Sequence, residues 1–273
     1  MSPLTPPAIP ASLPLVLGGH SFIHQLGTDP RPSEDTALKI VAACLEQGIT
    51  WFDTTYQPER IALGRILKRL NAREHATILA WNFFQDFDDS GHVGGPSCYT
   101  PDSMDLMCRQ LQTDVIDILV VHSMGNAEDD RRQEELALLW REQGRVRQLG
   151  VWHPDGNLTS GAYDFAIAPC NIADSGGERF PNYRTLGWET LATSPFVRGW
   201  LLERLAQRSG RPTEEIADLL LRYAGFHPSV DRLIVSIRKP AWVEKNVASW
   251  QRGPLSVEET GLLHELFVRF GSE

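Results

Sequence analysis

The sequence is poor in the features that mark secreted, membrane-spanning and nucleic-acid-binding proteins. It has only four cysteines, which show neither C-x-x-C spacing nor the pairing of a disulfide framework. No apolar run approaches the roughly 18 residues that a membrane-spanning helix needs. Lys and Arg number 26 against 35 Asp and Glu, and the formal net charge of −9 argues against nucleic acid or an anionic membrane as a partner. The first residues lack a basic segment followed by an apolar one, so we expect no signal peptide, a cytoplasmic location and reduced thiols.

Short apolar, β-prone segments alternate with helical patterns along the chain, which is typical of a parallel α/β protein. Several of them, such as ILVVH, are apolar on both faces, as strands between an inner core and an outer layer of helices must be. The length of 273 residues is close to the ~250 of a TIM barrel. We therefore predict a single (β/α)8 TIM barrel domain over residues 1–273, with a Pro-rich lead-in at 1–12. The predicted strands are Leu13–Leu17, Thr50–Thr54, Ala76–Trp81, Val115–His122, Arg147–Trp152, Phe165–Cys170, Glu189–Ser194 and Leu233–Ile237.

The intervening segments carry helix signals. Ser33 begins a segment whose apolar residues recur every three or four positions until Gly48. Pro58 stands near the start of the next helix, where proline is tolerated. A capping-box pattern begins a C-terminal helix at 256–271. The loop Gln85–Thr100 is rich in Gly and Asp and is the best candidate for a mobile segment over the mouth of the barrel.

Functional residues of such barrels lie where the strands end, at the C-terminal face. This rule alone selects a set of chemically capable side chains. They are His20, Asp53, Tyr56, Trp81, Asn82, His122, Trp152, His153, Asn171, Ser194, Ser236 and Arg238.

The order of motifs resembles the aldo-keto reductase superfamily over nearly the whole chain. GITWFDTTYQPERIALGRILKRL resembles the family's G-I-x-x-F-D-T-A-x-x-Y-G signature with a shortened loop, and QLQTDVIDILVVH resembles L-x-T-D-Y-I-D-L-x-x-x-H. GRVRQLGVW, TSPFVRGWL and RKPAWVEKNV resemble its G-K-I-R-x-I-G-V-S, Y-S-P-L-x-x-G-x-L and closing x-E-x-N segments. The resemblance implies an aldo-keto reductase-like (β/α)8 barrel.

The resemblance also implies a chemistry, which is reduction of a small carbonyl compound by NADP(H) with a tyrosine as proton donor. Asp53, Tyr56 and His122 match the family's catalytic aspartate, tyrosine and histidine. A phenol and an imidazole can donate to the oxygen on which charge builds. The implied substrate pocket is His20, Trp81, Asn82, Trp152, His153 and Asn171. The implied cofactor-binding residues are Ser194, Ser236, Arg238, Lys239, Glu244 and Asn246.

The sequence departs from the family pattern at the positions that contact the nicotinamide ring of the cofactor. Trp81 replaces the lysine that lowers the pKa of the family's tyrosine, or Asn82 does if the alignment slips by one residue. Trp152-His153 replaces the serine-asparagine pair that holds the nicotinamide amide. Ile167 and Thr193 replace its glutamine and its stacking tyrosine. We expect both tryptophan rings to border one pocket and to favour a flat or apolar ligand or a cation, unless they turn outward into the helical layer.

Three functions remain open. The first is an NADP(H)-dependent carbonyl reductase, and the second is a non-redox acid-base enzyme, such as a dehydratase, cyclase or isomerase. The third is a non-catalytic binding barrel. We expect a small-molecule partner, a monomer or weak homo-oligomer, and no metal, because no H-x-H or H-E-x-x-H spacing occurs.

Overall fold

Eight parallel strands form a closed barrel in the computed structural model, in which each strand pairs with its neighbours in sequence and β8 pairs with β1. The predicted (β/α)8 fold is confirmed, and the observed strands begin and end within two residues of the predicted ones. The structure describes residues 12–23, 32–84, 94–152, 158, 161–174 and 179–271. The strands are β1 (Leu15–Leu17), β2 (Trp51–Thr54), β3 (Thr77–Trp81), β4 (Ile116–His122), β5 (Val146–Trp152), β6 (Phe165–Pro169), β7 (Glu189–Thr193) and β8 (Arg232–Val235).

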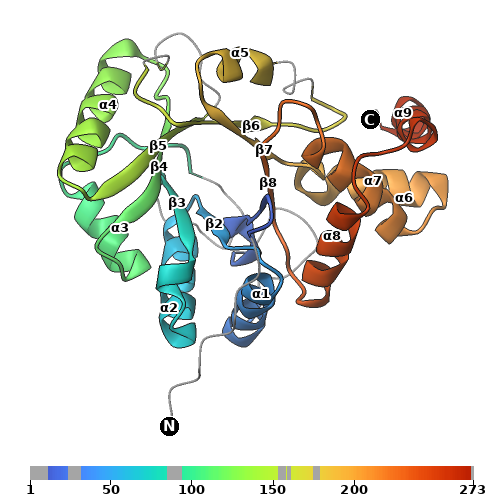
Figure 1. The fold of residues 1–273 in the computed structure, drawn as a ribbon, viewed down its shortest axis with the longest axis horizontal. Coiled ribbons are helices and arrows are strands. Elements are labelled where there is room, and N and C mark those ends of the chain that lie inside the picture. Colours follow the sequence, from blue (N-terminus) through green and yellow to red (C-terminus); the bar gives the residue numbers. More distant parts are fainter. Residues whose placement is uncertain are drawn as a thin grey trace.

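Helices surround the strands (Figure 1). The short 3-10 helices η1 (Gly19–Ser21), η2 (Arg73–His75) and η4 (Val197–Gly199) accompany the α-helices. The α-helices are α1 (Glu34–Glu46), α2 (Gln57–Leu70), α3 (Ser103–Leu111), α4 (Ala127–Glu142), α5 (Phe180–Thr185), α6 (Trp200–Ser209), α7 (Thr213–Gly225), α8 (Ala241–Gln251) and α9 (Val257–Phe270).

The helix boundaries follow from local hydrogen bonding. Ser33 caps α1 by accepting a hydrogen bond from the backbone N–H of Thr36 at 3.2 Å. Gly48, just after this helix, has a φ of +80°, which a residue without a Cβ adopts at little cost. The predicted capping box of the last helix is present, because Ser256 and Glu259 each accept from the other's backbone N–H.

The strand β4 shows how the barrel builds two separate apolar layers. Ile118 and Val120 point into the barrel and belong to its inner core, whereas Leu119 and Val121 belong to the core between strands and helices. All four side chains are fully buried. An alternating strand of this kind must be apolar on both faces.

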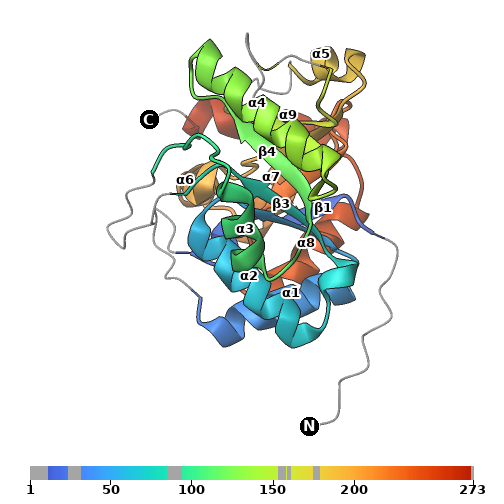
Figure 2. The ribbon, with the colours of Figure 1, turned by 90° about the vertical axis from the view of Figure 1, so that its left-hand side faces the viewer.

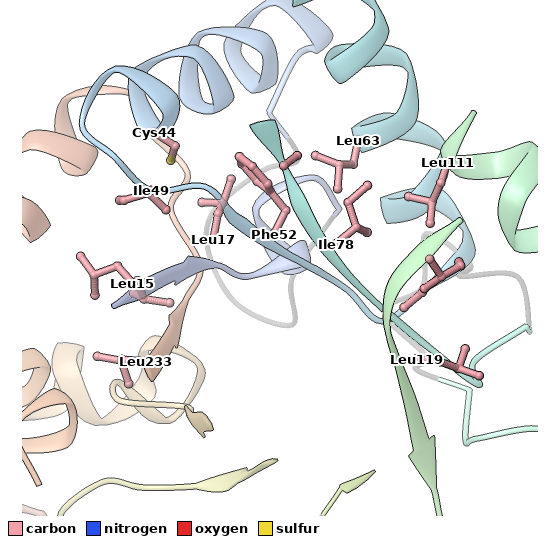
Figure 3. Close-up of a cluster of buried hydrophobic side chains, with 14 of the residues drawn as sticks. Leu15, Leu17, Cys44, Ile49, Phe52, Leu63, Ile78, Leu111, Leu119 and Leu233 are labelled. Carbon is pink, nitrogen blue, oxygen red and sulfur yellow. The ribbon is translucent and has the colours of Figure 1, made fainter. Parts of the chain in front are cut away.

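The outer core fills the space between the strands and the helices, as Figure 3 shows. Cys44 from α1, Leu63 from α2 and Leu111 from α3 meet strand residues such as Phe52 and Ile78 there. A further apolar cluster joins α6, α7 and α9 and seats the C-terminal helix against the other two.

The helices α1, α2 and α3 lie side by side along one flank of the barrel (Figure 2). No helix within the described ranges is long and apolar enough to cross a membrane. Most of the loop predicted to be mobile, residues 85–93, lies outside the described residues, and its last part, residues 94–100, contains no helix or strand.

Candidate functional site

A cleft of about 1130 Å³ opens at the C-terminal ends of the strands and runs outward between α7 and α8. All eight strands contribute to it through a residue in their last position or just beyond it, as expected for a barrel of this type. These residues include Gly18, Asp53, Trp81, His122, Trp152, Pro169, Thr193, Ser194, Ser236 and Arg238.

Aromatic rings form a continuous wall on one side of the cleft. The rings of Trp81 and Trp152 lie 5.3 Å apart, and Trp152 stacks on His122 with centroids 6.1 Å apart. Phe83 lies between Tyr56 and His122, at 5.3 and 5.5 Å from their centroids. Both tryptophans therefore point into the mouth of the barrel and not into the helical layer.

Asp53 at the end of β2 is bound by a tryptophan. The indole Nε1–H of Trp81 donates to Asp53 Oδ1 at 2.5 Å. Asp53 makes no ion pair within the described part of the chain, and its side chain is almost completely buried. Burial raises the pKa of Asp53 to about 6, although the hydrogen bonds from Trp81 and from the backbone N–H of Gly19 lower it. The carboxylate is thus held by neutral donors alone.

Glu59, in the first turn of α2, brings a second carboxyl group beneath the mouth of the cleft. Its Oε2 accepts from the backbone N–H groups of Thr55 and Tyr56 at 2.6 and 3.1 Å, and its side chain is fully buried. Burial and the charge of Asp53 raise the pKa of Glu59 to about 8. His20 Nδ1 lies 3.4 Å from the other oxygen, Oε1. We did not predict Glu59, because an acid in the first turn of a helix usually does no more than cap it.

Gly19 allows this close arrangement of acidic groups. A Cβ on Gly19 would collide with the Glu59 carboxyl group and would lie 2.8 Å from the backbone oxygen of Asp53. The backbone of η1 therefore closes over both carboxyl groups, and His20, the next residue, lines the cleft directly above them. Close approach explains the glycine here, since its φ is not positive.

His122 ends β4 and also lines the cleft. Its Nδ1 lies 2.9 Å from the backbone oxygen of Ser123, which can only accept, so Nδ1 is the nitrogen that donates in this contact. Asn82 fixes the backbone of His122 from behind by donating to its carbonyl at 3.0 Å and accepting from its N–H at 2.9 Å.

The prediction that Asn82 lines the pocket is wrong. Its amide is fully buried and also donates to Gln133 of α4.

Asn171 is likewise not a wall of the cleft. Its amide donates to the carbonyl of Ser194 at 3.1 Å and accepts from the N–H of Ala173 at 2.9 Å. These bonds tie the ends of β6 and β7 together. Ser194, predicted as a cofactor contact, does line the cleft, whereas His153 lies outside the described residues.

The outer part of the cleft carries basic and acidic side chains together, since Glu203, Glu214 and Asp218 also line it. Ser236, Arg238, Lys239 and Asn246 line it, as the resemblance to the family implies for cofactor contacts. Arg238 is 7% exposed and donates to the carbonyl of Ile23 at 2.8 Å. The Lys239 ammonium lies 4.7 Å from the centroid of the Trp242 ring. Glu244 stands apart from this group, because it is exposed on α8 and is not part of the cleft wall.

Arg60 binds the backbone of the loops that form the rim of the cleft, which are the residues just after β2 and at the end of β3. Its guanidinium is fully buried and donates to the carbonyl groups of Thr55, Trp81 and Phe83 at 2.8–3.2 Å. Its Nε donates to Gln110 of α3 at 2.6 Å. The loops that follow β2 and β3 are thereby tied to one side chain of α2.

No cluster of three or more His, Cys, Asp or Glu side chains suited to a metal ion occurs among the residues that the structure describes.

Comparisons with known proteins agree on one family. The pattern of the Aldo/keto reductase family matches residues 14–155, which is more than half of the chain. The fold is similar to that of a glycerol dehydrogenase from Gluconobacter oxydans, with a TM-score of 0.70, 16% identity, and coverage of 96% of this chain and 95% of that one. It is also similar to the holo form of an aldo-keto reductase from Bacillus halodurans, with a TM-score of 0.67, 20% identity, and coverage of 92% and 91%. No curated protein matches the chain.

Proposed function

The chain belongs to the aldo/keto reductase family, and on that premise we propose that it is an enzyme that acts on a small carbonyl compound by acid-base catalysis and not by hydride transfer. The observation that carries this proposal is the hydrogen bond between Trp81 and Asp53. The indole stands where the resemblance places a lysine, so the aspartate has a neutral partner in place of a cation.

The inner cleft does not fit a nicotinamide ring. The contact between Trp81 and Trp152, at 5.3 Å, fills space where smaller or cationic side chains stand in the family pattern. The two asparagines that could hold a carboxamide, Asn82 and Asn171, use their amides on the protein backbone. We therefore derive no step that requires hydride from this cofactor.

The remaining groups suit proton transfer. His122 lines the cleft and its Nδ1 lies 2.9 Å from the Ser123 carbonyl, an arrangement that suits a base acting through Nε2. Tyr56 lies on the far side of Phe83 from His122, at the edge of the same aromatic wall. A planar carbonyl compound lying on this wall would place its α-carbon near His122 and its oxygen near Tyr56. His122 would then remove the α-proton while the carbonyl oxygen accepts a proton, which gives an enol.

The first prediction tests this reaction with phenylacetone, a flat aromatic ketone with acidic α-protons. We expect the protein to accelerate exchange of these protons with deuterium from D2O, without added cofactor, because the aromatic wall holds the ring and His122 removes the proton. Proton NMR measures the loss of the α-proton signal, and heat-unfolded protein is the control. If exchange is not accelerated, and a parallel sample with added NADPH consumes the cofactor and forms the alcohol, the acid-base proposal is wrong.

A second candidate is an NADP(H)-dependent carbonyl reductase with Tyr56 as proton donor. It is favoured by one observation, which is that the cleft extends over Arg238, Lys239 and Asn246. These side chains suit the phosphate and base of a nucleotide, so the outer cleft fits one half of the cofactor even though the inner cleft does not fit the other.

The second prediction separates these two candidates by substitution. Trp81→Lys together with Trp152→Ser should tighten NADPH binding by ~10-fold or more, because the changes remove two large rings and return a cation to Asp53. Isothermal titration calorimetry measures the affinity, with the same double change to phenylalanine as a control that keeps aromatic bulk. Equal NADPH affinity in the parent and in the folded Lys/Ser variant would show that the tryptophans do not block the cofactor.

A further inference from the structure

Glu59 is a buried acid with one oxygen saturated and the other directed at a histidine of the cleft. Its Oε2 accepts two backbone hydrogen bonds, from Thr55 and Tyr56. Its Oε1 has no hydrogen-bond partner and lies 3.4 Å from His20 Nδ1. The Glu59 side chain is 0% exposed, whereas that of His20 is 28% exposed and lines the cleft. The pair therefore connects a fully buried carboxyl group to the cleft.

The groups around the Glu59 carboxyl determine its pKa and which of its oxygens carries the proton. The charged and titratable groups around Glu59 are Asp53 from β2, His20 from η1 and Arg60 from its own helix. Burial and Asp53 raise the pKa of Glu59 above neutrality, to about 8, while that of Asp53 stays lower, at about 6. This ordering favours a protonated Glu59 beside a charged Asp53 at neutral pH. Because Oε2 already accepts twice, the proton belongs on Oε1, opposite His20 Nδ1.

We propose that Glu59 and His20 form a proton relay that delivers a proton to the carbonyl oxygen of the ligand in the cleft. A neutral His20 that accepts from Glu59 at Nδ1 must carry its own proton on Nε2, which makes it a donor. The relay rests on the acid-base function proposed above, for which it supplies the acid.

The transfer balances within His122, His20, Glu59 and the ligand. As His122 removes the α-proton, the C–H electrons form the C=C bond and the carbonyl π electrons move to oxygen. The oxygen takes the proton from His20 Nε2, while His20 Nδ1 takes the proton from Glu59 Oε1. Glu59 becomes a carboxylate, which the N–H groups of Thr55 and Tyr56 hold at the N-terminus of α2, where negative charge is favoured. Reversal of the same steps returns both protons.

The test needs no ligand, because the relay fixes the tautomer of His20. We expect nitrogen-15 NMR of histidine-labelled protein to show the neutral Nε2–H tautomer of His20 at neutral pH, with the signal assigned by its loss in His20→Gln. As the pH rises through about 8, Glu59 loses its proton and the Nδ1–H tautomer should replace it. Glu59→Gln should abolish this change and keep the Nε2–H tautomer, because the glutamine oxygen is held by the N–H groups of Thr55 and Tyr56 and its NH2 group then donates to Nδ1.

Two NMR results would overturn the relay. One is an imidazolium or an Nδ1–H tautomer of His20 at neutral pH, and the other is the same pH-dependent change in folded Glu59→Gln. Glutamine has the size of the protonated acid and can still accept from the N–H groups of Thr55 and Tyr56, so circular dichroism should show a native fold.

The exchange reaction of phenylacetone separates the relay from the proposed function. If the parent exchanges α-protons, Glu59→Gln and His20→Gln should each slow exchange by ~10-fold or more, whereas His75→Gln, at the opposite end of β3, should not. Unchanged exchange in both variants would refute the relay and leave the acid-base function standing. The predicted tautomers without any exchange in the parent would support the hydrogen bond between Glu59 and His20 but refute both the acid-base function and the delivery of a proton to the ligand.

Discussion

Replacing Arg60 by methionine is expected to lower the free energy of unfolding by about 3–5 kcal/mol. The guanidinium is fully buried and donates to three rim carbonyl groups and to Gln110. Methionine fills much of the same volume but donates nothing, so these acceptors would lose their partner in a buried setting, at ~1–3 kcal/mol for each one left unsatisfied.

Urea unfolding monitored by circular dichroism measures this loss, and Arg65→Met is the matched control. Arg65 lies on the same helix but is exposed, so its replacement should change stability by less than ~0.5 kcal/mol. An equal effect of the two substitutions would show that the buried hydrogen bonds of Arg60 contribute nothing to stability.

His122→Gln is expected to slow α-proton exchange of phenylacetone by ~10²-fold or more, the usual scale for loss of a positioned base. The glutamine amide can still donate toward the Ser123 carbonyl, so the local backbone should be retained. Tyr56→Phe keeps the ring contacts with Phe83 and His20 and tests the hydroxyl alone, with a similar expected loss if that group touches the carbonyl oxygen.

His264→Gln serves as the control for these rates, because His264 is exposed on α9, far along the chain from every strand end. Exchange that persists in the Tyr56→Phe and His122→Gln double variant would place the chemistry elsewhere in the cleft.

The fold was predictable because its strands have a simple chemical signature. The strand β4 is apolar on both faces, so it is stable only where both faces are buried. The structure places Ile118 in the inner core of the barrel and Leu119 in the core between strands and helices. The rule that active-site residues follow strand ends then located Asp53 and His122 in the cleft.

The strand-end rule does not say whether a side chain points into the barrel or toward the helices. The sequence predicts part of this, because strand positions alternate between the two faces. Successive residues of a strand point to opposite faces. Since Trp81 points into the barrel, Asn82 must turn toward the helices, where it bonds Gln133. The same alternation correctly places His122 on the inner side, two residues beyond Val120. Applying it to β3 would have removed Asn82 from the predicted pocket.

Glu59 could not have been found in this way, because its burial depends on a distant segment. The sequence shows an acid in the first turn of a helix, which is normally a solvated capping group. The backbone of Gly19, forty residues earlier in the chain, closes over it and removes it from water. Such a contact follows from closure of the barrel, which places η1 beside α2, and not from any local pattern.

Arg60 also connects the rim of the cleft to the contact between α2 and α3 in the outer layer of helices. Gly64 lies one turn beyond Arg60 in α2, and there the two helices approach so closely that a Cβ would come within 2.5 Å of the Gln110 carbonyl in α3. The side chain of Gln110 meanwhile accepts from Arg60. The tight crossing at Gly64 and the Arg60–Gln110 hydrogen bond therefore connect α3 to the carbonyl groups that shape the cleft. Gly64→Ala would force the two helices apart at a point that does not itself line the cleft.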